Sequence, residues 1–164
     1  MSNYLSLCIR MAFLGIVFIL GACSPTESPP KPLVTGIYLD LEGRTVNLAE
    51  LRGKWVIVNY WASWCKPCFM EIPELNAFHL TYKDKDVVVL GVSFDRFDSI
   101  DALLPIVKKM GIHFPVLATD PASGLGIRQP SVLPATYVIN PKGELEAELL
   151  GLQTKRSLDA AIQK

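Results

Sequence analysis

The sequence is poor in residues that bind metals or nucleotides. It has only two histidines, His79 and His113, which lie far apart, and four cysteines. A structural zinc ion needs four ligands, and in finger proteins their spacings are short and fixed, a pattern that does not occur here. Neither GxGxxG nor GxxxxGK[ST], the common nucleotide-binding patterns, is present. We therefore expect no metal site and no nucleotide cofactor.

An excess of charge is also lacking. The 16 Lys and Arg residues balance the 16 Asp and Glu residues, and no five like charges follow one another. A chain without a basic stripe has no surface for a phosphate backbone, so we expect no nucleic-acid partner. With 164 residues, 50% of them hydrophobic, the chain is long enough to bury one core, and one globular domain is expected.

The apolar run near the N-terminus is too short to span a membrane. Residues 11–22 form an apolar stretch of 12 residues after Arg10, whereas a spanning helix needs roughly 20 residues. This length is typical of the core of a signal peptide, so residues 1–22 are predicted to be a signal peptide.

The residues that end this run, LGAC, resemble the lipobox of bacterial lipoproteins. The resemblance implies that Cys23 is lipidated and becomes the mature N-terminus; ordinary signal cleavage is the alternative. Residues 23–34 contain four prolines, which favour an extended tether over packed structure. The expected organisation is a signal peptide, a lipidated tether and a globular domain over 35–164. The lipid would anchor the protein to a membrane on the periplasmic side of a bacterial cell envelope.

Two cysteines remain for the globular domain. Cys8 lies in the predicted signal peptide and Cys23 is the predicted lipid site, which leaves Cys65 and Cys68 as a CxxC pair. Such a pair can close a small disulfide ring, bind a metal or be incidental, so its structural setting decides.

The hydrophobic pattern predicts alternating strands and helices. Apolar and β-branched runs predict strands at 54–61, 86–94, 114–118, 135–140 and 145–150, and a smaller hairpin from 36–41 and 44–48. Apolar residues at three- and four-residue steps predict helices at 66–82, 99–110 and 157–162. This order predicts an α/β fold with a mixed sheet and helices on both faces. The CxxC pair falls where a strand leads into a helix.

This setting favours disulfide chemistry. A cysteine at a helix N-terminus, beside Lys66, ionises more readily than a free thiol, so Cys65 is the expected nucleophile. Cys68, one helical turn later and more buried, would resolve the mixed disulfide and close the ring. The redox-active disulfide would then be the only redox group.

The residues around the pair carry a family resemblance. WCKPC at the end of a strand resembles the thioredoxin superfamily, and LRGKWVIVNYWASWCKPCFMEIPE, residues 51–74, is similar to the TlpA/ResA branch of membrane-tethered, extracytoplasmic thiol-disulfide oxidoreductases. The resemblance extends from about residue 35 to the C-terminus. It implies a thioredoxin-like fold with a central mixed β-sheet flanked by helices, an N-terminal β-hairpin and a strand-helix insertion at 86–110.

The resemblance also implies a catalytic carboxylate. Glu71 lies three residues after Cys68, on the same side of the predicted helix, and matches the glutamate of the family. It would act as the proton acceptor of the resolving thiol, or tune the pKa of that thiol. An exposed glutamate on the helix surface is the alternative.

A substrate-binding surface is expected around the cysteine pair. Pro134 aligns with the cis-proline of the superfamily, which lies opposite the disulfide, and with Leu133 it would dock the substrate backbone. Trp64 would flank the thiol pocket, and Lys66 and Pro67 between the cysteines would complete the surface.

Two classes of function follow. The favoured class is an enzyme that reduces disulfides in extracytoplasmic proteins such as apocytochrome c, with electrons from a membrane thiol partner. The spacing alone leaves the direction open: Lys66 favours a more oxidising couple, as in an oxidase or isomerase of secreted proteins, and the resemblance favours a reductase. The other class is a metal chaperone that binds copper through Cys65 and Cys68. A peroxidase of the same fold is a further alternative.

Overall fold

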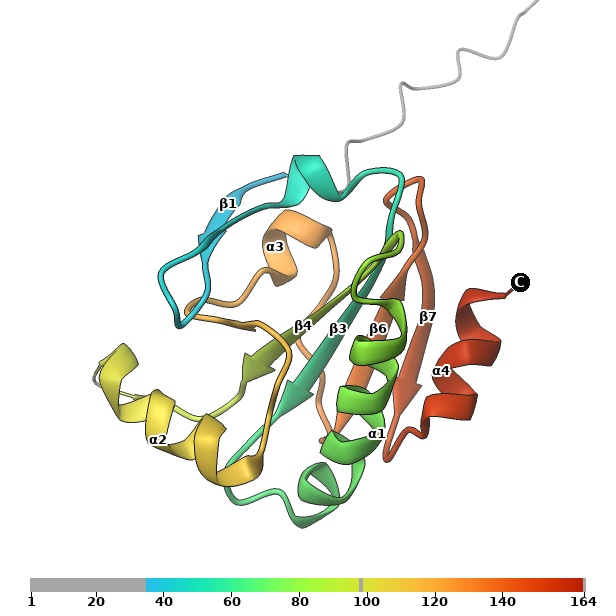
Figure 1. Cartoon of the computed structure of the whole chain (residues 1–164). Helices are drawn as coiled ribbons and strands as arrows, with labels where there is room; N and C mark the ends of the chain where they lie inside the picture. The colour runs from blue at the N-terminus through green and yellow to red at the C-terminus, as the bar shows by residue number, and fades with distance from the viewer. Residues whose placement is uncertain (1–34, 98, 164) are drawn as a thin grey trace, which may run out of the picture. The chain divides into compact units, whose positions relative to one another are not determined.

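The computed structural model describes residues 35–97 and 99–163 (Figure 1). The predicted signal peptide and tether, with Cys23, lie outside the described residues. No helix among the described residues combines the length and the apolar character needed to cross a membrane.

A mixed sheet of five strands forms the centre of the domain. The strand order is β5-β4-β3-β6-β7, with β3 at Trp55–Trp61, β4 at Val87–Ser93, β5 at Val116–Leu117, β6 at Ala135–Ile139 and β7 at Leu145–Leu150. Strand β3 pairs parallel with β4 and antiparallel with β6. Residues 56–61 of β3 are all buried, which explains why this part of the sequence is apolar and aromatic except at Asn59.

Three helices pack on one face of the sheet. They are α1 at Lys66–Tyr82, α2 at Ile100–Met110 and α4 at Lys155–Ile162, and all contribute to the same hydrophobic core. Figure 1 shows α1 in front of the strands and α4 beside β7, and the two helices contact each other. On the other face, the expected helices are two short ones of four residues each. Strands β3, β4 and β5 step across the sheet in one direction, so right-handed crossovers place α1 and α2 on the same face.

The opposite face is covered by short elements. A two-stranded hairpin, β1 at Ile37–Leu39 and β2 at Thr45–Asn47, leads into the 3-10 helix η1 at Leu48–Leu51. With α3 at Ala122–Leu125, these segments cover a second hydrophobic core that contains Leu48 and Leu125.

The predicted elements lie where expected, with differences at their ends. Helix α1 covers the predicted 66–82, and β7 covers the predicted 145–150. Strand β5 is shorter than 114–118, because only Val116 and Leu117 pair with β4. Helix α4 begins two residues early, at Lys155, because Thr154 caps it. The short helices η1 and α3 were not predicted.

Candidate active site

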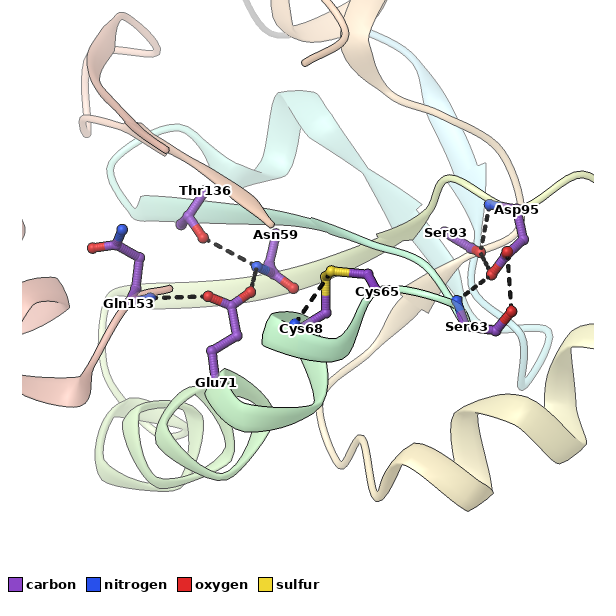
Figure 2. Close-up of a disulfide and its surroundings, with 9 residues drawn as sticks. All are labelled: Asn59, Ser63, Cys65, Cys68, Glu71, Ser93, Asp95, Thr136 and Gln153. Carbon is purple, nitrogen blue, oxygen red and sulfur yellow. Dashed lines mark hydrogen bonds between the residues drawn. A yellow bond between two sulfur atoms is a disulfide. The ribbon is translucent and has the colours of Figure 1, made fainter. Parts of the chain in front are cut away.

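The CxxC pair forms a disulfide at the N-terminus of α1. Cys65 and Cys68 are bonded, with their Cα atoms 5.3 Å apart. Cys65 is the N-cap residue of the helix, and its Sγ accepts a hydrogen bond from the Cys68 N–H at 3.2 Å. Figure 2 shows the disulfide at this helix end. A thiolate at this position would be stabilised by the same N–H group and by the helix dipole.

The two cysteines differ slightly in their exposure to solvent. Cys65 is 4% exposed and Cys68 is 0% exposed. Both cysteines are buried, and Cys65 is the more accessible of the two. This asymmetry fits the attacking and resolving roles that the sequence predicts.

An aspartate holds the loop that precedes the disulfide. Asp95 follows β4, and its carboxylate accepts hydrogen bonds from the Ser63 N–H at 2.7 Å and from the Ser63 hydroxyl at 3.1 Å. The hydroxyl of Ser93 also donates to Asp95, at 3.3 Å. The loop between β3 and Cys65 is thus tied to the end of the neighbouring strand (Figure 2). The sequence pattern had not indicated a role for Asp95.

Glu71 lies fully buried behind the disulfide. Its side chain is 0% exposed, so the exposed alternative is wrong. Glu71 Oε1 accepts a hydrogen bond from Asn59 Nδ2 at 2.7 Å, and Oε2 accepts one from the Gln153 N–H at 3.0 Å. Burial raises the pKa of Glu71 to about 7, although both hydrogen bonds favour the charged form and act in the opposite direction. A carboxyl group with this pKa can both accept and release a proton near neutral pH.

Asn59 and Thr136 extend this buried polar group across the sheet. Asn59 on β3 also donates through Nδ2 to Thr136 Oγ1 on β6, at 3.1 Å, and both side chains are fully buried. Sequence reasoning missed both residues. A signal was present for Asn59, because a polar residue inside the apolar run WVIVNYW must find a buried partner.

The predicted substrate-binding residues occupy different settings. Trp64 is 69% exposed beside the disulfide, and Lys66 and Pro67 are exposed at the start of α1. Leu133 is half-buried and Pro134 is buried, and the peptide bond between them is cis.

The strand register brings Pro134 to the end of the sheet that carries the disulfide. Ala135 pairs with Tyr60 on β3, so Pro134 lies beside the last residue of that strand. The carbonyl of Pro134 accepts a hydrogen bond from the Gly151 N–H at 2.8 Å. Binding of a substrate by these residues stays a prediction.

Among residues 35–97 and 99–163, no three His, Cys, Asp or Glu side chains form a cluster that could hold a metal ion. The chemical groups gathered here are a disulfide, a buried carboxyl group and their hydrogen-bond partners. This combination defines a thioredoxin-fold protein with a redox-active disulfide.

Comparison with known proteins agrees with this class. The model of the AhpC/TSA family matches residues 30–148. The thiol-disulfide oxidoreductase ResA of Bacillus thuringiensis (strain Al Hakam) is 33% identical over 128 residues, which cover 78% of this chain and 73% of that protein. The chain therefore belongs to the AhpC/TSA family, as a thiol-disulfide oxidoreductase of the ResA type.

Solved structures agree with the fold. A DsbF homologue from Corynebacterium diphtheriae has a TM-score of 0.67 and 27% identity, covering 84% of this chain and 94% of that one. A thiol:disulfide interchange protein of the thioredoxin family from Chlorobium tepidum TLS has a TM-score of 0.69 at 24% identity, covering 84% of this chain and 97% of that one. The thioredoxin-like fold expected from the sequence is confirmed.

Proposed function

We propose that the protein reduces disulfide bonds in extracytoplasmic proteins, with Cys65 as the attacking thiol and Cys68 as the resolving thiol. The observation that carries this proposal is the layered arrangement of the site. Cys65 is 4% exposed at the helix N-terminus, whereas Cys68 and Glu71 lie fully buried behind it.

The reaction consists of two thiol-disulfide exchanges. The Cys65 thiolate attacks one sulfur of the substrate disulfide, and the other substrate sulfur leaves with the electron pair and takes up a proton. Cys68 then gives up its thiol proton and attacks Sγ of Cys65. The bond between Cys65 and the substrate breaks, the second substrate sulfur leaves with its electron pair and takes up a proton, and the Cys65–Cys68 disulfide closes. Two electrons have passed from the protein to the substrate.

Glu71 receives the proton that Cys68 gives up. It lies one helical turn after Cys68 on the same buried side of α1, and its pKa is raised by burial to about 7. A base with a pKa near the working pH can accept a proton and later release it. The buried carboxyl group thus replaces water, which cannot reach Cys68.

The surface around Cys65 favours a protein substrate. Trp64 is 69% exposed, Phe69 is 37% exposed and Met70 is 62% exposed, and all three lie within five residues of Cys65 along the chain. Large exposed apolar side chains beside a reactive group are typical of protein-binding surfaces. Leu133 and Pro134 would dock the substrate backbone, and Lys66 and Pro67 would border it.

The proposed location rests on the N-terminal sequence. Residues 1–22 act as a signal peptide, Cys23 carries the lipid, and residues 23–34 tether the domain 35–164 to the membrane on the periplasmic side of the envelope. Apocytochrome c is the proposed type of substrate, and a membrane thiol protein supplies the electrons. The family resemblance of residues 51–74 favours this direction of electron flow.

The reduction potential of the Cys65–Cys68 couple tests the direction. The full chain is equilibrated in detergent with defined thiol buffers, and the disulfide fraction is measured. A potential below about −230 mV supports a reductase. A potential of about −120 to −180 mV assigns the protein to the oxidases and isomerases instead. A chain that forms no Cys65–Cys68 disulfide refutes both, and copper binding by the reduced chain would then favour the metal chaperone.

A further inference from the structure

The strand that leads to the disulfide carries unpaired polar atoms in the core. Among the described residues, two buried side-chain atoms have no hydrogen-bond partner: Oδ1 of Asn59 and Nε1 of Trp61. Both side chains are fully buried on β3. Buried polar atoms are normally paired, so each exception calls for a physical reason.

The orientation of the Asn59 amide is fixed by its other atom. Nδ2 donates to Glu71 Oε1 at 2.7 Å and to Thr136 Oγ1 at 3.1 Å, which uses both amide hydrogens. A flipped amide would turn its oxygen toward the carboxylate of Glu71 and lose the stronger of these bonds. The oxygen therefore stays on the other side.

That other side is the side of the disulfide. Figure 2 shows the Asn59 side chain between Glu71 and the Cys65–Cys68 bond, with the amide oxygen turned toward Cys68. Strand alternation agrees with this view, because Ile57 and Trp61, two residues away on either side of Asn59, belong to the same core cluster as Cys68.

The redox state of the cysteines decides whether this oxygen can be paired. A disulfide sulfur has no hydrogen, so it cannot donate to a carbonyl oxygen. A thiol can donate through S–H. The site thus holds an acceptor that has no donor in the disulfide form, and reduction adds an S–H donor at Cys68.

We propose that Asn59 is a positioning residue of the resolving step: its Oδ1 accepts a hydrogen bond from the Cys68 thiol in the reduced protein, while its Nδ2 holds the carboxyl group of Glu71. This inference rests on the proposed roles of Cys68 and Glu71. The amide of Asn59 then positions both the Cys68 thiol, which gives up a proton, and the Glu71 carboxyl group, which receives it.

This hydrogen bond keeps Cys68 protonated until the substrate is bound. A neutral S–H that donates to a carbonyl is stabilised over its thiolate, so Cys65 alone is the thiolate of the free enzyme. When Cys68 attacks the mixed disulfide, its S–H bond breaks and the proton goes to the Glu71 carboxylate. The new Cys65–Cys68 bond forms, and the substrate sulfur leaves with the electron pair. Asn59 exchanges no proton.

The S–H stretching band of Cys68 tests the hydrogen bond. Infrared spectra of the reduced full chain in detergent are compared with those of Cys68→Ser, and the band that is lost belongs to Cys68. We expect this band at lower frequency than that of a free thiol. Asn59→Leu should return it to the free-thiol position. It should also shift the equilibrium with glutathione toward the disulfide, about fivefold for the loss of one hydrogen bond.

Thr136→Val is the matched control. It keeps the shape of the side chain and removes the other acceptor of the same amide, at an equally buried position. It should lower the thermal midpoint without moving the band or the glutathione equilibrium. Equal shifts in both variants would reduce Asn59 to a structural role and overturn the inference.

The position of the wild-type band decides the question even if Asn59→Leu does not fold. A wild-type Cys68 band at the free-thiol frequency overturns the inference. A displaced band in a chain that reduces no protein disulfide would support the hydrogen bond and refute the proposed function, so that the two failures are distinguishable.

Discussion

Replacement of Glu71 by glutamine tests how the buried carboxyl group changes the free energy of unfolding with pH. The group has a pKa of about 7 in the folded protein, where burial disfavours its charge, and an ordinary value of 4.5 in the unfolded chain. The folded state therefore binds the proton more tightly. The contribution of Glu71 protonation to the stability of the fold is complete below pH 4.5 and is lost as the pH rises through 7.

The magnitude follows from the difference between these two pKa values. A difference of about 2.5 pKa units corresponds to about 3 kcal/mol of unfolding free energy, lost between pH 4 and pH 8. Glutamine has the same size and no charge, so this loss is absent in Glu71→Gln. One hydrogen bond is sacrificed at every pH, because the new amide must turn its NH2 group toward Asn59 or the Gln153 N–H. This lost hydrogen bond lowers the unfolding free energy of the variant by about 1 to 3 kcal/mol at every pH.

The assay is urea denaturation of the oxidised chain at a series of pH values. The free energy of the wild type is subtracted from that of Glu71→Gln, which cancels every other titrating group. We expect the difference to rise in favour of the variant by about 3 kcal/mol from pH 4 to pH 8. Glu74→Gln provides the reference for a half-buried carboxylate on the same helix, which accepts a backbone N–H from Lys155 at 2.7 Å. A difference for Glu71→Gln that stays flat over this range would refute the argument that burial raises the pKa of Glu71.

Three further predictions concern the reaction and its surroundings. Cys68→Ala should trap a covalent mixed disulfide with protein substrates on non-reducing gels, and Cys65→Ala should trap none; the opposite result would exchange the two roles. Asp95→Ala should leave the Ser63 N–H without its partner and lower the unfolding free energy by about 1 to 3 kcal/mol, measured by urea denaturation. An unchanged urea midpoint would mean that the loop before Cys65 keeps its conformation without Asp95. Trp64→Ala should raise KM for a protein substrate severalfold and move the thermal midpoint little, because the side chain is 69% exposed. An unchanged KM would remove Trp64 from the substrate surface.

The sequence predicts the helices and strands whose residues follow a clear hydrophobic pattern. Helix α1 was predicted over 66–82 because its apolar residues recur at helical steps, and β3 because its run is β-branched and aromatic. The helices η1 and α3 have four residues each, which is too few to show a period. Strand β5 was predicted too long, since Pro115 lacks an N–H and only two residues pair with β4.

The same limit applies to the site. The cysteines and Glu71 lie within one short segment, so their spacing and their family resemblance identify them. The partners of Glu71 come from elsewhere: Gln153 is 82 residues away in the chain and binds through its backbone N–H, which no side chain identifies. Asp95 reaches Ser63 from 32 residues away. Contacts of this kind follow only from the fold.

The distance between Glu71 and Gln153 along the chain also sets an order of events during biosynthesis. The chain emerges from its N-terminus, so the two cysteines are synthesised long before the segment that closes the hydrogen bonds around the carboxyl group. A nascent chain that ends before residue 153 already has both thiols and lacks this closure. The hydrogen bond from the Gln153 N–H to Glu71 therefore forms late, when the C-terminal segment docks beside α1, and an unfinished chain carries the cysteine pair without this bond.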